Sequence, residues 1–375
     1  MKTDILDRDL FDQLANADGN EMISIYIPTH RRGREVSQDR IRLKNELSAA
    51  SEQLAARGRK PRERSSRLSL AERLLDDREF WEHQSKGLGV FIDDAGDITT
   101  VSLSTEMGST CAVMPVFLLR PLAGELKLPV VPVLALTRGS VGLYEVSVKG
   151  VARVEADLPE SFEDVNWFVD REKQRQQHPD RAGTARGRHG HEPDARENED
   201  LRRFLREVAD ALPTADGGTP LVVLGDDELV GRFEKEAQQP TVSPANSGLS
   251  SPISDGQILN LATPIVEDMN RAADEAAVAE AMEQLGLGNA STDVGEALVD
   301  AISGRTAKVV FHRGSEPAWG RVDETSLEVT VSEERSFADV DLLDRLVVYT
   351  IGKGGSIRPV DSPLDGRPFV AIRRF

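Results

Sequence analysis

The residues best suited to proton chemistry lie together in the middle of the chain. The run from Arg186 to His191 reads RGRHGH, so two imidazoles, His189 and His191, flank Gly190. An imidazole donates or accepts a proton near neutral pH, and a guanidinium holds phosphate. Imidazole also binds Zn²⁺ or Mn²⁺, but a metal site needs ligands fixed on rigid elements. We therefore predict no metal site, and either a functional loop or a solvated one with incidental histidines.

This run belongs to a polar stretch, residues 171–197, that we expect to form a long loop. The stretch contains glycine and proline and has no apolar face, which is typical of a mobile connection. Between Arg171 and His191 it holds 6 Lys or Arg, Arg181 among them, against 2 Asp or Glu. The predicted loop is therefore basic.

Motifs of other catalytic classes are missing from the sequence. There is no G-x-x-x-x-G-K-[ST] phosphate loop, no G-x-G-x-x-G after a strand and no G-x-S-x-G elbow. Cys111 lies in a strand-like TCAVMPV segment without a basic neighbour that would lower its pKa. We expect an inert, packed thiol, and one cysteine excludes an intramolecular disulfide framework.

The composition is that of a soluble globular protein with two or three domains. Of 375 residues, 39% are hydrophobic and 29% charged, and no apolar run reaches the ~18 residues that a membrane helix needs. The first residues, MKTDILDRDLFDQL, lack the basic-then-apolar order of a signal peptide. We expect a cytoplasmic protein with no membrane partner.

The net charge of −18 is unevenly spread. Residues 31–67 hold 12 Lys or Arg against 5 Asp or Glu, whereas residues 261–375 hold 12 against 20. A basic region can bind phosphate even on an acidic protein, but a solvated helix face has the same composition. The cations that fit either interpretation are Arg31, Arg32, Arg34, Arg40, Arg42 and Lys44.

Residues 1–127 are predicted to form an α/β domain. Isoleucine alternates with polar residues over residues 23–27, which indicates a strand. Apolar residues recur every three or four positions over residues 36–56, which predicts a helix. A second helix over residues 67–76 precedes an apolar strand and a turn at residues 94–97.

A central domain, residues 128–251, and a C-terminal domain, residues 252–375, are predicted to follow. Three strand-like runs form a meander in the central domain, and the loop, a helix, a strand and a helix complete a mixed sheet. The C-terminal domain opens with a helix over residues 253–285 that is broken at Thr263-Pro264. Its later helices and strands predict an α/β/α sandwich.

Seven segments of the chain, taken in order, carry a family resemblance. They are SIYIPTHRRGREVSQDRIRLKNEL, FWEHQSKGLGVFID, FLLRPL, VLALTRGSVGLYEV, PLVVLGDDEL, AWGRVDE and LLDRLVVYTIGKGG. Together they resemble the bacterial archaeo-eukaryotic release-factor-like family, and we favour its third subgroup. The resemblance covers essentially the whole chain.

The resemblance implies three domains similar to those of the archaeo-eukaryotic peptide release factor and of Pelota. The central domain would be ribonuclease-H-like without that enzyme's active site, and the C-terminal domain would resemble a kink-turn-binding ribosomal protein and the C-terminal domain of Pelota. In that superfamily a Gly-Gly-Gln tip on a central-domain loop enters the peptidyl-transferase centre, where it helps water attack the ester between peptide and tRNA.

The present chain departs from that pattern at the tip, since no Gly-Gly-Gln occurs in it. The nearest match is Gly187-Arg188-His189-Gly190-His191, so the candidate catalytic residues are His189, Gly190 and His191. Arg181, Arg186 and Arg188 are candidate contacts with RNA. No Asn-Ile-Lys-Ser-like stop-codon motif occurs in residues 1–127 either, so we expect no codon-specific termination.

Three functions therefore remain open at the level of the sequence. The first is a cytoplasmic release or rescue factor that binds ribosomal RNA and hydrolyses peptidyl-tRNA without a cofactor. The second is a non-catalytic ribosome-binding stress or dormancy factor. The third is an adaptor that works through the acidic C-terminal domain, whose charge favours a protein partner over RNA.

Overall fold

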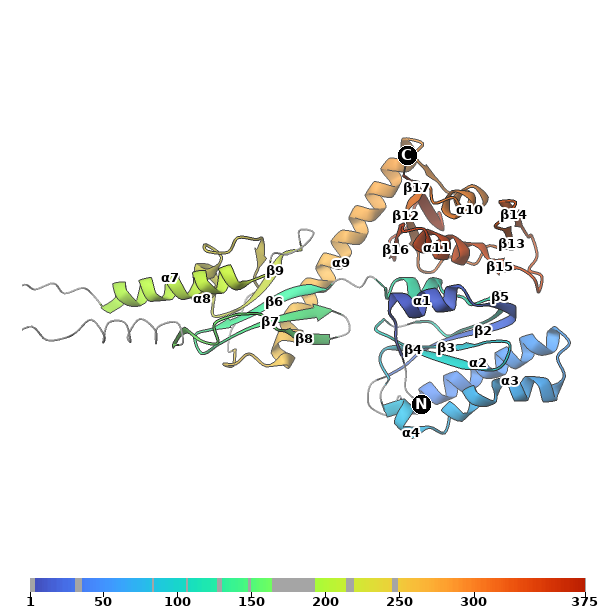
Figure 1. The fold of residues 1–375 in the computed structure, drawn as a ribbon, viewed down its shortest axis with the longest axis horizontal. Coiled ribbons are helices and arrows are strands. Elements are labelled where there is room, and N and C mark those ends of the chain that lie inside the picture. Colours follow the sequence, from blue (N-terminus) through green and yellow to red (C-terminus); the bar gives the residue numbers. More distant parts are fainter. Residues whose placement is uncertain are drawn as a thin grey trace, which may run out of the picture. The chain divides into compact units, whose positions relative to one another are not determined.

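The computed structural model describes residues 4–30, 36–82, 84–105, 107–126, 130–147, 150–163, 193–213, 219–244 and 249–374. The chain forms two compact units (Figure 1). One contains residues 1–128 and 271–375, and the other contains residues 129–270. Both are mixed α/β structures, as predicted. The partition into domains at residues 1–127, 128–251 and 252–375 stays a prediction.

The N-terminal part of the first unit is built on a five-stranded sheet. Its strand order is β1-β4-β3-β2-β5, with β1 parallel to β4 and the other neighbours antiparallel. The predicted strand at residues 23–27 lies within β2. The strands are β1 (Asp4–Ile5), β2 (Asp18–Pro28), β3 (Gly87–Ile92), β4 (Ile98–Leu103) and β5 (Thr110–Val116).

Helices cover both faces of this sheet because its strands alternate two sets of apolar side chains. Ile23, Ile25 and Ile27 pack with helices α2, α3 and α4, whereas Met22 and Tyr26 pack on the opposite face with α1 and α5. The helices are α1 (Arg8–Ala15), α2 (Val36–Ala56), α3 (Pro61–Leu74), α4 (Arg78–Glu82) and α5 (Arg120–Ala123).

Helix α2 has the predicted bounds, and α3 begins earlier than predicted. The apolar stripe of α2 at Leu43, Leu47 and Leu54 is buried, as its spacing requires. Helix α3 begins at Pro61 because proline suits the first turn and the Glu63 carboxylate accepts from the backbone N–H of residue 60.

The edge strand β5 is closed off by side chains. Gln53 on α2 donates to the carbonyl of Cys111 (3.0 Å) and accepts from the N–H of Val113 (3.1 Å), so its amide replaces a neighbouring strand. Arg57 and Arg335 both donate to the carbonyl of Val113. These contacts prevent another chain from pairing with this edge.

The C-terminal part of the first unit is the predicted α/β/α sandwich. Its main sheet has the order β11-β17-β12-β16, and a small sheet has the order β14-β13-β15. Helices α10 and α11 cover one face of the main sheet, and α9 covers the other. The elements are α9 (Asp255–Gly286), β11 (Ala290–Ser291), α10 (Val294–Ile302), β12 (Thr306–His312), β13 (Trp319–Asp323), β14 (Glu328–Val331), β15 (Val340–Asp341), α11 (Leu342–Gly352), β16 (Ser356–Val360) and β17 (Phe369–Arg373).

The two parts of this unit share one hydrophobic core. Phe11 of α1 and Leu122 of α5 lie in the same buried cluster as Leu346 of α11. Asp344 of α11, which is buried, accepts from the backbone N–H groups of Leu119 (2.6 Å) and Arg120 (2.5 Å). Residues more than 200 positions apart in the sequence are therefore joined by both apolar and polar contacts.

The second unit has a mixed sheet with the order β10-β9-β6-β7-β8. Strands β6, β7 and β8 form the predicted antiparallel meander, and β9 and β10 extend it in parallel, which is the ribonuclease-H-like arrangement that the resemblance implied. Helices α7 and α8 cover one face and the first half of α9 the other. The remaining elements are β6 (Val131–Thr137), β7 (Ser140–Ser147), β8 (Gly150–Val154), α7 (Pro193–Ala211), β9 (Leu221–Gly225), α8 (Asp227–Phe233) and β10 (Thr241–Val242).

The break predicted at Thr263-Pro264 is wrong, because α9 continues through the proline. Ile258, Ala262 and Val266 lie on one face of α9 and are buried against the sheet on both sides of Pro264. This packing outweighs the local cost of a proline inside a helix, which is ~3 kcal/mol.

Candidate functional site

Residues 193–197 of the predicted loop lie instead in the first turns of helix α7, which begins at Pro193. The rest of the predicted loop, residues 171–192, lies outside the described part of the chain. This holds for His189, Gly190 and His191, and also for Arg181, Arg186 and Arg188. Among the predicted RNA contacts of the first domain, Arg31, Arg32 and Arg34 lie outside it as well. Their roles stay predictions.

The described members of the first basic group, Arg40, Arg42 and Lys44, lie on α2. Arg42 is bound to Asp39, a buried carboxylate, at 2.7 Å. Asp39 also accepts from the backbone N–H of His30 (2.8 Å) and contacts its ring Nδ1 (2.9 Å). Asp39 therefore anchors the start of α2, and Arg42 supports that anchor, whereas the side chain of Lys44 is exposed.

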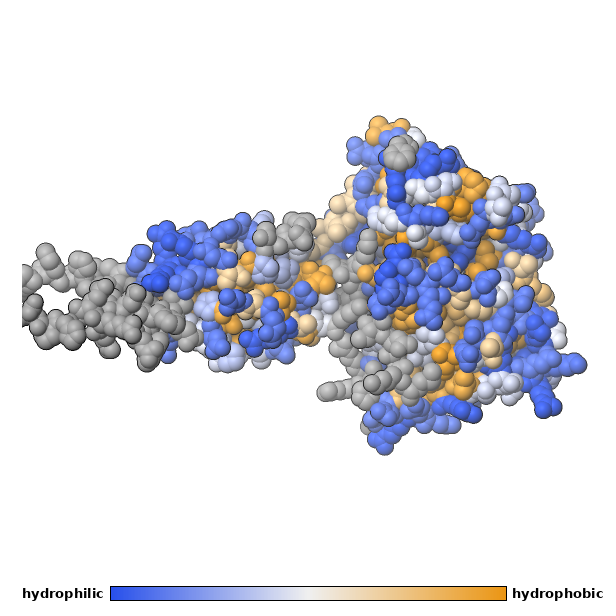
Figure 2. All heavy atoms as spheres, viewed as in Figure 1, coloured by the Kyte–Doolittle hydropathy of each residue, from blue (hydrophilic) through white to orange (hydrophobic). Residues whose placement is uncertain are grey.

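A second basic group lies at the turn between α2 and α3, and we call it the basic hairpin. Hydrophilic side chains cover this region of the surface (Figure 2). Its residues surround a hollow of about 660 Å³ whose lining also includes the carboxylates of Glu21, Glu63 and Asp94. The basic hairpin consists of Arg59, Lys60, Arg62, Arg64 and Arg67.

Two carboxylates, of which Glu21 is buried and Asp94 is exposed, hold two arginines of the basic hairpin in place. Glu21, only 4% exposed, accepts from Arg59 Nε at 2.9 Å and from Arg67 Nη1 at 3.2 Å. Arg67 also binds Asp94 at 2.6 Å. Burial alone would raise the pKa of Asp94, but hydrogen bonds from the backbone of residue 20 and from Arg67 outweigh it and lower that pKa. Asp94 therefore stays ionised and keeps Arg67 fixed.

The other cations of the basic hairpin remain available to a ligand. Lys60 and Arg62 are exposed, and within the described ranges neither has a carboxylate partner. Arg64 donates through Nη1 to the carbonyl and hydroxyl oxygens of Ser51, and its buried Nε has no partner in that same part of the chain. Fixed and free guanidinium groups around one hollow suit the phosphates of a nucleic acid backbone.

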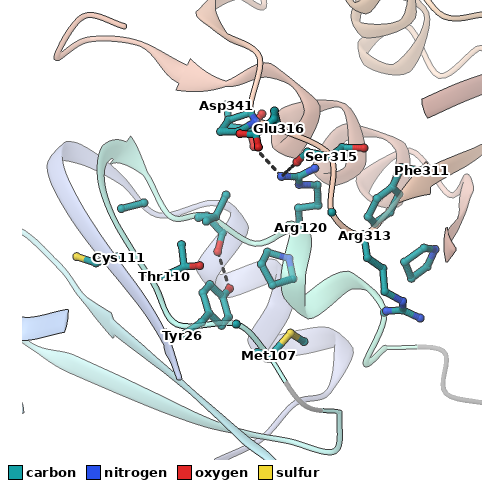
Figure 3. Close-up of a pocket in the computed structure, with 18 of the residues that line it drawn as sticks. Tyr26, Met107, Thr110, Cys111, Arg120, Phe311, Arg313, Ser315, Glu316 and Asp341 are labelled. Atoms are coloured by element: carbon teal, nitrogen blue, oxygen red, sulfur yellow. Dashed lines mark hydrogen bonds and ion pairs between the residues drawn. The ribbon is translucent and has the colours of Figure 1, made fainter. Parts of the chain in front are cut away.

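A second hollow, of about 840 Å³, lies where the N-terminal and C-terminal parts of the first unit meet (Figure 3). Arg120 extends from α5 toward Asp341 and Ser315 of the C-terminal part. Its Nη2 lies 3.4 Å from Asp341 Oδ2 and donates to the carbonyl of Ser315 at 3.1 Å. The hydroxyl of Tyr26 donates to the carbonyl of Leu118 at 2.6 Å, which fixes the opposite wall.

The surroundings of Cys111 agree with the prediction that its thiol is unreactive. Burial raises the pKa of the Cys111 thiol to about 12, and the nearby carboxylate of Glu46 adds to the effect. Arg335 opposes it but does not compensate. Across the described ranges, no group of three metal-ligating side chains is present, and no helix is both long and apolar enough to span a membrane.

The sequence did not reveal the carboxylates that organise these groups. Glu21 and Asp94 lie 73 positions apart and meet only when β2 and the β3–β4 turn come together. Gly19 permits this approach, because a Cβ at that position would lie 2.6 Å from Asp94 Oδ2. The only local signal was the density of arginine over residues 57–67, within the basic region already noted.

Comparison with known proteins supports the resemblance. The model of bacterial archaeo-eukaryotic release factor family 3 matches residues 132–305, which confirms the resemblance to that family over this segment. No curated protein matches the chain.

Solved structures of translation factors also match the chain. An archaeal translation termination factor, aRF1, is 15% identical over 99% of both chains with a TM-score of 0.25. Pelota of Archaeoglobus fulgidus is 13% identical over 77% of this chain and 79% of its own, with a TM-score of 0.31. Dom34 of S. cerevisiae, described as a translation termination-like factor, is 10% identical over 74% of this chain and 72% of its own, with a TM-score of 0.34.

Proposed function

We propose that this chain, a bacterial archaeo-eukaryotic release-factor-like protein, binds the ribosome and acts in the release or rescue of stalled translation. The basic hairpin is the observation that carries the RNA-binding part of this proposal. It places five cations around one hollow, and a buried carboxylate positions two of them. Positioned guanidinium groups bind phosphate with less loss of side-chain entropy than free ones do.

The charge distribution fits an RNA contact through this part of the molecule. Long-range repulsion from a chain of net charge −18 would oppose binding, but the Debye length is ~8 Å at physiological salt. The basic hairpin can therefore attract RNA phosphates at short range. The repulsion between RNA and the acidic surface farther away is screened by salt. Its phosphate contacts would be independent of nucleotide sequence, which agrees with the missing stop-codon motif.

The segment matched by the family model, residues 132–305, includes the predicted basic loop. In the proposed reaction His189 or His191 orients a water molecule, and Arg186 or Arg188 binds the end of the tRNA. The water oxygen attacks the carbonyl carbon of the peptidyl ester. The ester C–O bond then breaks, and the ribose oxygen that leaves takes up a proton from the water and becomes the free hydroxyl of the tRNA. Positioning of water supplies much of the rate in such a reaction.

The second candidate function is a ribosome-binding factor without hydrolytic activity. The sequence observation that favours it is the absence of Gly-Gly-Gln. In that case the loop would occupy the peptidyl-transferase centre and block it, while the basic hairpin makes the same contacts with RNA.

Release of labelled peptide separates the two candidates. Full-length protein is mixed with ribosomes that carry labelled peptidyl-tRNA, and the released peptide is measured. The catalytic proposal predicts release by the wild type, loss of release in the double variant His189→Ala/His191→Ala, and normal release in the matched loop variant His178→Ala. Binding without release by the wild type would support the non-catalytic function instead.

A further inference from the structure

The hollow of about 840 Å³ in the first unit has the size and lining of a small-molecule site. Pockets that bind small ligands commonly measure ~300–1,000 Å³ and combine apolar walls with a few converging polar groups. The hollow lies between β5 and α5 on one side and the loop that follows β12 on the other. Its apolar lining includes Tyr26, Met107, Met114, Phe311, Pro317 and Trp319.

The polar groups of this hollow are incompletely paired within the protein. Arg120 is 12% exposed, and its Nη1 is buried with no hydrogen-bond partner in the described part of the chain. Oδ2 of Asp341 is likewise buried, and among the described residues only the ion pair with Arg120, at 3.4 Å, compensates its charge. A buried donor without a partner costs about 1–3 kcal/mol, so a ligand that supplied an acceptor to Arg120 would recover part of that cost.

A second guanidinium approaches the same hollow from the C-terminal part. Arg313 contacts Asp361 at 3.3 Å, but both side chains are largely exposed, so the pair is weak and Arg313 can turn toward a ligand. A third, Arg335, is already engaged, since it donates to the carbonyl of Val113 and stacks 4.0 Å above the ring of Trp319. Of the three arginines that line the hollow in the described part of the chain, Arg120 and Arg313 are therefore the two available to an anion.

We propose that this hollow binds a small organic anion, whose carboxylate or phosphate group contacts Arg120 and Arg313 and whose apolar body packs beside Met114 and Trp319. A charge-assisted hydrogen bond to the anion would satisfy Nη1 of Arg120. The ligand would bridge the N-terminal and C-terminal parts of the unit. The site involves neither the basic hairpin nor the loop, so it is independent of the proposed function.

Asp341 would oppose binding when it is ionised, because it competes for Arg120 and repels an anion. Charged groups from three elements interact electrostatically with Asp341, and they are Arg120 of α5, Asp344 of α11 and Arg335 of the loop between β14 and β15. Removing its charge should therefore increase affinity. Asparagine is also a good helix N-cap, so Asp341→Asn keeps the cap that Asp341 provides to α11.

Calorimetric titration of the full-length protein tests this site with three probes of similar size. Phenyl phosphate and benzoate carry an anionic group on an apolar ring, and phenol is the neutral control. At about pH 8, where Asp341 is ionised, we expect saturable binding of at least one anion and at least about tenfold weaker binding of phenol. Comparison of the affinities for phenyl phosphate and benzoate shows whether the site prefers a phosphate or a carboxylate group.

Variants locate the binding. The single variants Arg120→Gln and Arg313→Gln should each lower the affinity for the preferred anion by about tenfold. Asp341→Asn should raise that affinity. Arg305→Gln, at an exposed arginine outside the hollow, should leave affinity unchanged. Arg313 is exposed, so its variant remains informative even if Arg120→Gln fails to fold. The proposal is overturned if neither anion binds at millimolar concentration, if phenol binds equally well, or if Arg313→Gln does not change affinity.

Discussion

Replacing Asp344 by alanine should destabilise the whole first unit, because this carboxylate joins its two parts. Asp344 is 1% exposed. Its Oδ1 accepts from two backbone N–H groups, at positions 119 and 120, and its Oδ2 accepts from Nη2 of Arg345 at 2.7 Å. Arg345 is itself 5% exposed and also donates to the carbonyl of Phe117. Alanine would leave both amides and a buried guanidinium without this partner.

The size of the effect follows from these contacts. Breaking a buried ion pair by removing one partner costs ~3–5 kcal/mol. For a unit of this size that corresponds to a decrease of roughly 6–20 °C in Tm. Asp344→Asn keeps one acceptor oxygen for the amides and removes only the charge, so it should decrease stability less than Asp344→Ala does. Asp361→Ala, at an exposed carboxylate, should change stability by no more than about 0.5 kcal/mol.

Tryptophan fluorescence during urea unfolding measures the effect in both parts of the unit. Trp81 is buried in the N-terminal part and Trp319 lies in the C-terminal part, so two single-tryptophan proteins report each part separately. We expect coincident transitions that both shift to lower urea in Asp344→Ala. A decrease of less than about 1 kcal/mol in the free energy of unfolding would refute the shared core. So would a shift of the urea transition reported by Trp319 without a shift at Trp81.

Three further predictions concern single sites. Cys111, with a pKa near 12, should react with iodoacetamide at about pH 8 roughly 100-fold more slowly in the folded than in the unfolded protein, as followed by mass spectrometry. Burial raises the pKa of Asp341 to about 6, so its contribution to stability is present at low pH and lost as the pH rises from about 4 to about 6. Asp341→Asn should remove that part of the pH dependence in urea unfolding. Finally, Lys60→Gln/Arg62→Gln should lower the slope of log affinity for ribosomes against log salt by about 1.5, because two phosphate contacts are lost, while Arg305→Gln should leave it unchanged.

The long periodic elements could be predicted from the sequence because their pattern reflects burial directly. Helix α2 has the predicted bounds, and the three predicted strands of the central meander are present as β6, β7 and β8. Helix α2 and strands β6 and β7 carry buried apolar side chains, and burial of such a stripe outweighs weaker local preferences. Strand β8 is more exposed and forms by pairing with β7.

Short elements could not be predicted in the same way. Strand β16 follows the turn Gly352-Lys353-Gly354-Gly355 and contains Pro359, which argues locally against a strand. It forms because it pairs in parallel with β12, nearly 50 positions earlier in the chain. At Pro264 the local signal was also misleading, since packing of α9 on the sheet maintains the helix there.

The candidate sites were predicted only in part. The density of charged residues can be read from a short stretch of sequence, whereas the ion pairs of those residues depend on partners that are distant in the sequence. The basic composition of residues 31–67 identified the region, but the sequence could not distinguish Arg42, which is bound to a buried carboxylate, from exposed Arg62. The hollow lined by Arg120 and Asp341 joins residues more than 200 positions apart, so no local pattern encodes it.

Binding of the purified full-length protein to bacterial ribosomes, measured by co-sedimentation across a salt series, tests the central claim most directly. We expect the protein to pellet with ribosomes at about 50 mM salt and to be released progressively toward about 200 mM. Failure to pellet at the lowest salt, where phosphate contacts are strongest, would contradict a ribosomal role for this protein.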